Sequence, residues 1–261
     1  MSQEDIIMRI WKYAIVMMSL CSPYLYASEQ NHECCENKYF APVIALTGGM
    51  AINSDAGASQ NFPIGYSQLD YDTHHETEIR GVFGGFLGTE FSLLPIWSLQ
   101  LGVAYYQTTP FAAEGLLAQG VNPATTAKYE YNYKIISHQA LVEGKLLLKR
   151  HERFHPYISA GLGAAFNQAK DFNVYFPPTL AMTPQYDDHT TTSFTYNVGL
   201  GLDVDLSEHF RIGIGYRFTD LGKASLGNGE YDQFDPTSIS STLEQSHLYT
   251  QEVLAQLTYI M

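Results

Sequence analysis

Charged residues are scarce in this sequence: they make up 16% of its 261 residues, against about 25% in an average soluble domain. Basic residues are the scarcer sign, because 14 Lys and Arg stand against 27 Asp and Glu, which gives a net charge of −13. Binding to nucleic acid is therefore not expected, since contacts to phosphates need cationic side chains. The acidity instead predicts an exterior that attracts cations.

Long apolar runs and cysteine are also lacking. Beyond the N-terminal segment, no stretch of about 18 apolar residues occurs, which argues against membrane-spanning helices. A chain of this kind can cross a membrane only as a closed barrel, in which all backbone polar groups are paired. With 3 Cys and no further Cys or His at ligand spacing from them, neither a metal site nor a cofactor is predicted.

The N-terminal segment has the order of a secretory signal peptide. A basic stretch ending at Lys12 precedes the apolar run from Tyr13 to Leu20, and Ala27 provides the small residue of a cleavage site. We expect residues 1–27 to be removed and translation to begin at Met8. An uncleaved membrane anchor is the alternative, but the apolar run is too short for one.

Residues 28–38 are expected to form a periplasmic N-terminal tail, which contains the adjacent Cys34 and Cys35. A disulfide between neighbours in the sequence would be strained, so a disulfide to another chain and two free thiols are the alternatives. Cys21 lies in the signal segment, and the large Leu20 before it argues against a lipoprotein cysteine.

Alternation of bulky apolar residues with small or polar ones predicts strands throughout the rest of the chain. In Phe194–Leu206 every even position is bulky and apolar, while Gly, Asn, Thr and Asp stand between. Phe210–Phe218 and Trp97–Tyr105 repeat this period of two. Less regular strands are expected at about 39–52, 76–91, 127–148, 155–168 and 247–261.

The apolar phase of segment 127–148 changes near Lys134, from Tyr129, Tyr131 and Tyr133 to Ile136 and its even neighbours, which predicts a β-bulge. The connections alternate between short turns and long loops rich in Gly, Pro, Asn, Asp and Ser. The loops are 53–75, 109–126, 169–190 and 222–246. This alternation is typical of outer-membrane barrels, whereas structureless loops of about 20 residues are rare in a compact soluble domain.

The composition of the polar phase indicates which face of the barrel is outside. A solvent-facing phase would be rich in Lys, Glu and Gln, but here it is mostly Gly, Ser, Thr, Asn and Ala, which suits a narrow eight-stranded interior. Aromatic residues near strand ends, such as Tyr105, Tyr216 and Tyr259, fit girdles at lipid boundaries. We therefore predict an all-β, eight-stranded antiparallel up-and-down transmembrane barrel over residues 39–261, rather than a soluble lipocalin-like barrel.

With the apolar phase facing lipid, ten charged residues are expected inside the lumen, where they must pair because isolated buried charge is prohibitive. They are Glu78, Arg80, Glu90, Glu143, Lys145, Asp203, Asp205, Arg211, Arg217 and Glu252. A narrow charged pore is the alternative to a lumen closed by ion pairs, but eight strands leave little room for one.

Three features carry a resemblance to a known family. The C-terminal strand has Leu257, Tyr259 and Met261 on one face, and glycine alternates through Pro156–Gly163 and Gly215–Gly222. On these features the chain resembles the outer-membrane barrel superfamily of the outer-membrane protein A transmembrane domain, its small adhesin-like relatives and the W-type barrels, over roughly the whole mature chain. The family usually ends in Phe, where this chain has Met261.

The resemblance implies a protein of the Gram-negative outer membrane, in contact with its lipid and lipopolysaccharide. Barrel-assembly machinery would recognise the C-terminal strand, and salt bridges would plug the lumen. The resemblance further implies a barrel without enzymatic activity, which has a structural role in the envelope or mediates adhesion to a host or surface ligand. The alternative is a W-type barrel that passes small hydrophobic molecules through a lateral opening.

Aromatic and apolar residues in the long loops offer contacts for adhesion, or they pack on one another. They are Phe62, Tyr66, Tyr71, Phe111, Phe172, Tyr175, Phe176, Phe234 and Ile239.

The sequence poorly matches the catalytic residue pairs of small barrel enzymes. Ser137-His138 and Ser246-His247 are adjacent, and adjacent strand residues point to opposite faces, so neither makes the Ser–His dyad of lipid-A deacylases. Asp187-Asp188-His189 and residues 72–76 superficially resemble the Asp–Asp and His–Asp pairs of omptin proteases. Omptins have ten strands, however, so a lipid-A hydrolase or protease is the less favoured alternative to a protein without catalysis.

Overall fold

The computed structural model describes residues 40–55, 60–64, 67–73, 79–94, 96–120, 128–149, 153–175, 184–231, 237–239 and 242–261. The expected signal peptide, the start at Met8, the tail with Cys34 and Cys35, and Glu78 lie outside the described residues. Within them, no helix has the length and apolarity needed to cross a membrane.

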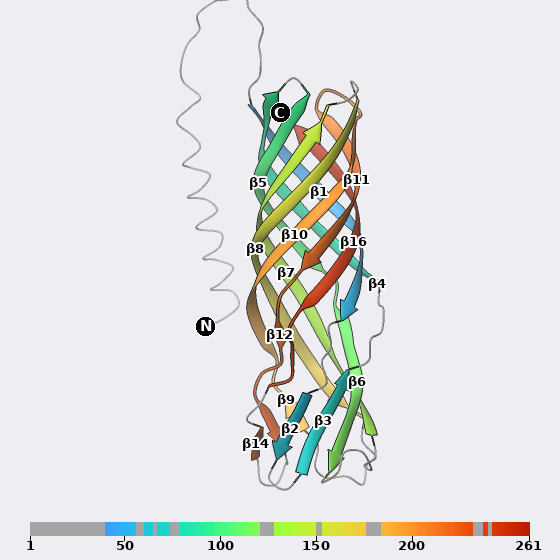
Figure 1. Ribbon diagram of the computed structural model, residues 1–261, viewed down its shortest axis with the longest axis vertical. Coiled ribbons are helices and arrows are strands. Elements are labelled where there is room, and N and C mark those ends of the chain that lie inside the picture. Colours follow the sequence, from blue (N-terminus) through green and yellow to red (C-terminus); the bar gives the residue numbers. More distant parts are fainter. Residues whose placement is uncertain are drawn as a thin grey trace, which may run out of the picture. The chain divides into compact units, whose positions relative to one another are not determined.

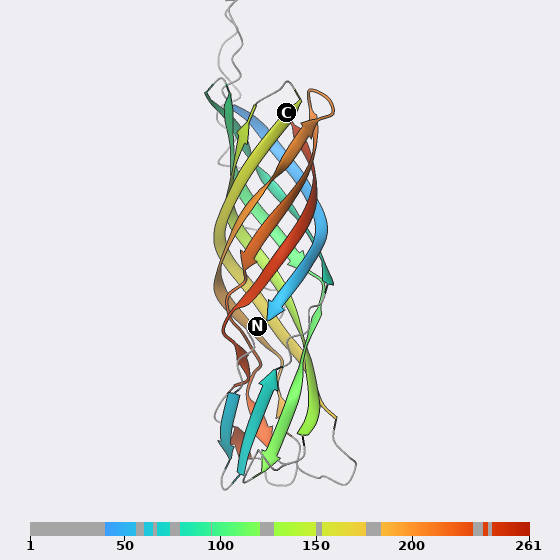
Figure 2. The same ribbon diagram turned by 45° about the vertical axis from the view of Figure 1, so that its right-hand side comes forward.

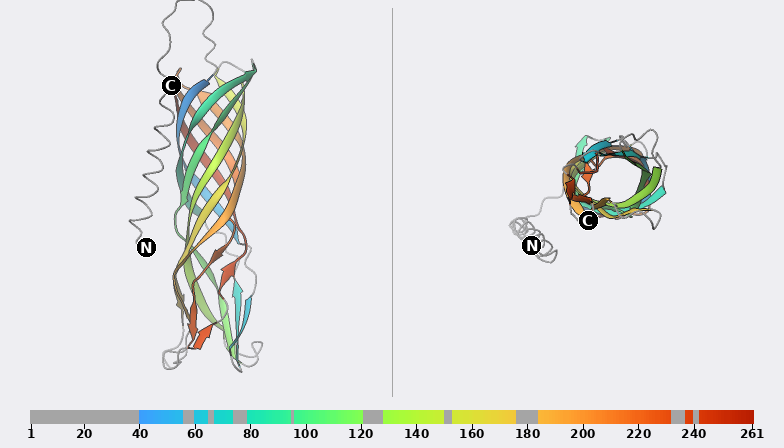
Figure 3. Two further views of the ribbon diagram at one scale, coloured as in Figure 1. Left: turned by 90° about the vertical axis from the view of Figure 1, so that its left-hand side faces the viewer. Right: turned by 90° about the horizontal axis from the view of Figure 1, so that it is seen from below.

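Eight long antiparallel strands form a closed ring (Figures 1 and 3). The ring closes because β7 pairs with β8 and β16 pairs with β1. This confirms the predicted eight-stranded fold. In ring order the strands are β1 (Phe40–Asp55), β4 (Ile79–Leu94), β5 (Trp97–Thr108), β7 (Lys128–Leu148), β8 (Phe154–Val174), β10 (His189–Asp205), β11 (Phe210–Asp220) and β16 (Leu248–Ile260).

The period of two sorts side chains onto the two faces of this wall. In β10, Leu200 on the outer face is 60% exposed, whereas Asp203 on the inner face is 1% exposed. Large apolar side chains cover the outside of the ring, as an apolar surrounding requires, and polar ones fill most of the inside. A small apolar cluster also lies inside: Val43, Ala45, Phe86, Ala104, Tyr106 and Leu141. Leu257, Tyr259 and Met261 lie on the apolar outer face.

The long connections contain further strands, so the expectation of structureless loops was wrong. These strands are β2 (Gln60–Ile64), β3 (Ser67–Thr73), β6 (Phe111–Gly120), β9 (Pro184–Tyr186), β12 (Ala224–Ser225), β13 (Gly229–Tyr231), β14 (Thr237–Ile239) and β15 (Glu244–Gln245). Together with the parts of β7 up to Ile135 and of β8 from Ala169 on, they form a structure beyond the ring that we call the extension (lower part of Figures 1 and 2).

Hydrogen bonds join the pieces of the extension. Beyond the end of β5, strand β6 takes its place beside β7, with pairing from Phe111↔Ile135 onward. Strand β3 pairs with β6, and β2 pairs with β3. The outer strand β2 is tied to β15, because the side-chain amide of Gln60 donates to the carbonyl of Glu244 and accepts from its N–H at 3.2 Å. This contact covers part of a sheet edge that would otherwise be open.

The extension has an apolar core, so its polarity is the inverse of the ring's. A segment that projects into water must keep its apolar side chains inside, whereas a segment in lipid must keep them outside. This inversion was not predicted from the sequence, because the period of two does not show whether water or lipid surrounds a strand. The core residues are Phe62, Leu69, Tyr71, Phe111, Ala113, Leu117, Tyr131, Tyr133, Ile135, Ala169, Tyr186, Leu221, Ala224, Leu226, Leu243 and Leu248, with Phe172 and Val174 packed against them.

This inversion also explains the phase change near Lys134. Strand β7 does not switch sides there: Tyr133 and Ile135 point inward, and so do Ser137 and the odd residues that follow. The register with β8 does shift between Asn132 and Lys134, but the extra residue is in β8. The bulge in β8 places Asp171 at φ 57°, in the left-handed region that Asp tolerates better than most residues.

Candidate functional site

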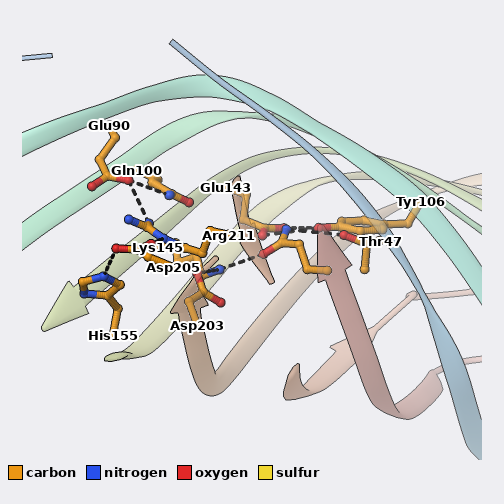
Figure 4. A network of polar contacts seen from close by, with 11 residues as sticks. Thr47, Glu90, Gln100, Tyr106, Glu143, Lys145, His155, Asp203, Asp205 and Arg211 are labelled. Atoms are coloured by element: carbon orange, nitrogen blue, oxygen red, sulfur yellow. Dashed lines mark hydrogen bonds and ion pairs between the residues drawn. The ribbon is translucent and has the colours of Figure 1, made fainter. Parts of the chain in front are cut away.

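Polar side chains from all eight ring strands meet inside the lumen (Figure 4). Nearest the short turns, Arg211 of β11 is the centre of one group. Its Nη1 lies 3.0 Å from Glu90 Oε2 and its Nε 2.7 Å from Asp205 Oδ1. His155 Nε2 lies 2.6 Å from the other oxygen of Asp205, and Gln100 donates to Glu90 at 2.8 Å. The two carboxylates bind the guanidinium group directly, and Gln100 and His155 hold the carboxylates in place.

A second group surrounds Lys145 of β7. Its Nζ donates to Asp203 Oδ2 and to Gln256 Oε1, each at 2.7 Å, and lies 3.8 Å from the centre of the Tyr157 ring. Gln256 in turn contacts Thr47 at 3.4 Å. The side chain of Lys145 is 5% exposed and that of Asp203 is 1% exposed, so the charge of the ammonium group is compensated by protein groups rather than by bulk water.

A third group surrounds Arg217 of β11. Its Nη2 and Nε each lie 2.6 Å from Glu252 Oε2, and Glu143 lies 4.0 Å from its Nη1. The phenol of Tyr106 donates to Glu143 at 3.1 Å, while its ring lies 3.7 Å from the guanidinium carbon. Thr250 donates to the second oxygen of Glu252 at 2.9 Å.

Two of these contacts cross the full width of the barrel. Lys145 and Gln256 stand on β7 and β16, and Tyr106 and Arg217 on β5 and β11; each pair of strands is four steps apart in the ring of eight. Side chains from opposite walls therefore touch. Between the second and third groups, a cavity of about 30 Å³ lined by Tyr106, Lys145 and Arg217 among others remains, which is room for a water molecule or two.

The structure brings eight of the ten expected luminal charges into these ion pairs: Glu90, Glu143, Lys145, Asp203, Asp205, Arg211, Arg217 and Glu252. Arg80 lies instead near the extension, where it interacts electrostatically with Glu114. Sequence reasoning missed His155, Gln100, Tyr106, Tyr157 and Gln256, all of which point inward. The alternation could have found them, because each lies in the inward-facing phase of its own strand.

The residues considered for catalysis are separated by the strand geometry. The hydroxyl of Ser137 lies inside and donates to Asn167 at 2.6 Å, while His138 on the outer face is 2.7 Å from the Tyr105 phenol. Asp188 accepts from the backbone N–H of Asp171, and His247 lies 3.2 Å from Asp220. Among the described residues, no group of three His, Cys, Asp or Glu is placed to hold a metal ion.

The aromatic residues expected to offer contacts for adhesion differ in their exposure within the extension. Phe62, Tyr71 and Phe111 are buried in its core and Phe172 packs against them, whereas Tyr175 is 58% exposed. The side chains of Tyr66, Phe176, Phe234 and Ile239 lie outside the described residues. Burial in the same core raises the pKa of Tyr186 to about 12.

A model of the outer membrane protein beta-barrel domain matches residues 41–243 of the sequence. The chain belongs to this family. This outer-membrane barrel accordingly resides in the outer membrane of a Gram-negative bacterium, with its apolar outer face in lipid. In barrels of this kind the short turns usually face the periplasm and the longer connections face the exterior.

Solved structures of outer-membrane barrels are similar to this one at low identity. Outer membrane protease OmpT from Escherichia coli is 12% identical over 88% of this chain and 99% of its own, with a TM-score of 0.45. Neisserial surface protein A is 10% identical over 84% and 96%, with a TM-score of 0.40. The attachment invasion locus protein of Yersinia pestis is 11% identical over 85% and 98%, with a TM-score of 0.37. No curated protein matches the sequence.

Proposed function

We propose that this outer-membrane barrel is a non-conducting, non-enzymatic scaffold that holds a folded β-extension on the cell surface for attachment to a surface ligand. The contacts between opposite walls of the lumen carry this proposal. Lys145 with Gln256, and Arg217 with Tyr106, meet at 2.7 Å and 3.7 Å across the barrel, so these side chains occupy the path that a solute would need. A salt-bridged plug is the role that we assign to the luminal charges.

The extension supports a role at the surface. Its apolar core holds the long connections in fixed strands. A rigid surface of this kind loses less conformational entropy on binding a partner than a mobile surface does. The net charge of the chain, −13, favours partners that carry positive charge. The host or surface ligand of the protein is therefore to be sought on the outside of the extension.

Two further partners follow from the same assignment. We infer that the outer face contacts lipid and lipopolysaccharide, and that barrel-assembly machinery recognises β16 through Leu257, Tyr259 and Met261, which are 46%, 38% and 46% exposed. A non-enzymatic role is supported by the positions of Ser137 and His138 on opposite faces of β7. A narrow pore and a lateral-exit transporter for small hydrophobic molecules are the alternatives.

Conductance in planar lipid bilayers tests the plug. We expect the reconstituted wild-type protein to show no steady openings, and the double variant Lys145→Ala, Arg217→Ala to show them, because both contacts across the lumen are lost. The matched control is Lys134→Ala, Lys223→Ala, which removes two cations outside the lumen. Large, steady openings of the wild-type protein would overturn the proposal.

Attachment is tested separately with a strain that lacks the protein. We expect its adhesion to host cells or to a coated surface to fall, and plasmid-borne wild type and the double lumen variant to restore it alike. Uptake of a hydrophobic solute is measured in the same strains. Unchanged adhesion together with reduced uptake would replace the attachment role by transport.

A further inference from the structure

The outer surface of the extension contains a pocket of about 360 Å³, which is within the size range of small-molecule sites. It lies where β6 pairs with β7, and Tyr175, which directly follows β8, forms its side. Its lining consists of Glu114, Gly115, Leu116, Glu130, Tyr131, Asn132 and Tyr175.

The register of the two strands explains which side chains surround the pocket. Glu114 pairs with Asn132 and Leu116 pairs with Glu130, so these four residues share the outward face, and Gly115 and Tyr131 between them point to the core. Glu114 and Glu130 are thus diagonal neighbours across the strand pair, a relationship that places residues about 7–8 Å apart.

Tyr175 fixes one side of the pocket by two hydrogen bonds. Its backbone N–H donates to the carbonyl of Glu130 at 2.9 Å, and its hydroxyl accepts from Asn132 Nδ2 at 3.3 Å. On the core side, Gly115 is tightly packed, because an added Cβ would lie 2.4 Å from the carbonyl oxygen of Asp72, which fixes the backbone of β6 beneath the pocket. The pocket is therefore built by positions with defined backbone and side-chain contacts.

The chemistry of this lining combines two carboxylates with apolar surface. A metal ion is disfavoured, because no group of three potential ligands occurs in the part of the chain that the structure describes. Two carboxylates at a diagonal separation suit two ammonium groups on one flexible stem. Leu116 and the exposed ring of Tyr175 offer contacts to a methylene chain and to a cation.

We propose that this pocket binds an aliphatic diamine or polyamine, with one ammonium group on Glu114, another on Glu130 and the methylene stem between them. The inference deepens the proposed surface role, since it names a ligand class for the extension. It does not depend on whether the lumen conducts.

Calorimetric titration of the full mature chain, folded in detergent at low salt, tests the site with cadaverine as the probe. We expect saturable binding of one cadaverine per chain, and weakening by about tenfold or more in Glu114→Gln and in Glu130→Gln, because each loses a charged hydrogen bond. The matched control is Glu208→Gln, which removes one exposed carboxylate at a periplasmic turn. Heat-modifiable gel migration verifies that each variant is folded.

The other arms separate this site from its alternatives. Pentanediol, which has the same stem without charge, is expected not to bind, and butylamine is expected to bind at least about tenfold more weakly than cadaverine. Equal weakening by Glu208→Gln would show diffuse attraction to an acidic surface and overturn the site. Displacement of cadaverine by an equal concentration of Mg²⁺, or tight binding of butylamine, would overturn the diamine assignment. Absence of saturable binding would also overturn it, while the conductance experiment would still decide the plug.

Discussion

The guanidinium carbon of Arg217 lies 3.7 Å from the centre of the Tyr106 ring, although the two residues stand on opposite walls of the barrel. The same guanidinium group is paired with Glu252 at 2.6 Å. One side chain of β11 therefore connects to its neighbour β16 and to β5 across the lumen. Because the guanidinium is planar and holds its charge, it can stack on a ring and bind a carboxylate at once, which a lysine could not do equally well.

Removal of Arg217 is predicted to destabilise the folded barrel by about 3–5 kcal/mol, because Arg217→Met leaves Glu252 buried without its cation. The measurement is urea unfolding in detergent. The double variant Arg217→Met, Glu252→Gln is expected to lose less unfolding free energy than the two single variants lose together, since it leaves no uncompensated charge in this pair. Additive losses would show that the two side chains do not act as a pair.

The ring could be predicted from the sequence because its strands obey one rule. In β10 from Phe194 on and in β11 up to Phe218 the even residues are apolar and the odd ones small or polar, so the period predicted the strands and the composition of the polar phase predicted their lipid-facing side. The luminal charges followed from the same phase. Their pairing across the barrel could not be read from the sequence, because the partners of Lys145 are 58 and 111 residues away.

The extension could not be predicted because its rule is reversed. Tyr131 and Tyr133 are apolar residues that point inward, while Ile136, a few residues later in the same strand, points outward. Strand β7 passes from water to lipid, so its apolar residues change from odd to even positions. In the sequence this change looks like the effect of a β-bulge in β7. Short strands such as β12 and β15, of two residues each, carry too little pattern to be recognised.

A cavity in the core of the extension is expected to loosen it without unfolding the ring. Leu117 is 0% exposed, so Leu117→Ala should cost the extension about 2–5 kcal/mol. Limited proteolysis of the folded protein is expected to cut the extension faster while the ring keeps its heat-modifiable migration. Leu116→Ala, on the outward side of the same strand, is the control. Equal cleavage rates in wild type and Leu117→Ala would contradict the packed core.

The bulge in β8 is predicted to tolerate glycine at position 171 but not a β-branched residue. Asp171 has φ 57°, where a side chain branched at Cβ is strained, so Asp171→Val should destabilise by about 1–2 kcal/mol. Asp171→Gly relieves the backbone but loses the exposed ion pair with Lys134, worth about 1 kcal/mol or less, and is expected to be close to neutral. Thermal unfolding of both variants checks this, with Lys170→Val as a neighbour of ordinary conformation.

Ionisation of Tyr186 is predicted to make the extension sensitive to alkali. Burial raises the pKa of this phenol to about 12 in the folded protein, above its ordinary value of about 10. The unfolded chain therefore loses this proton at lower pH than the folded one, and the stabilisation is complete below about pH 10 and is lost as the pH rises toward about 12. Ultraviolet absorbance of tyrosinate, compared between wild type and Tyr186→Phe, is expected to show one late-titrating tyrosine missing from the variant. In Tyr175→Phe, where the ring replaced is largely exposed, that late titration is retained. If Tyr186→Phe instead removed a tyrosine that titrates near pH 10, the phenol would be in water and the core of the extension would not be closed around it.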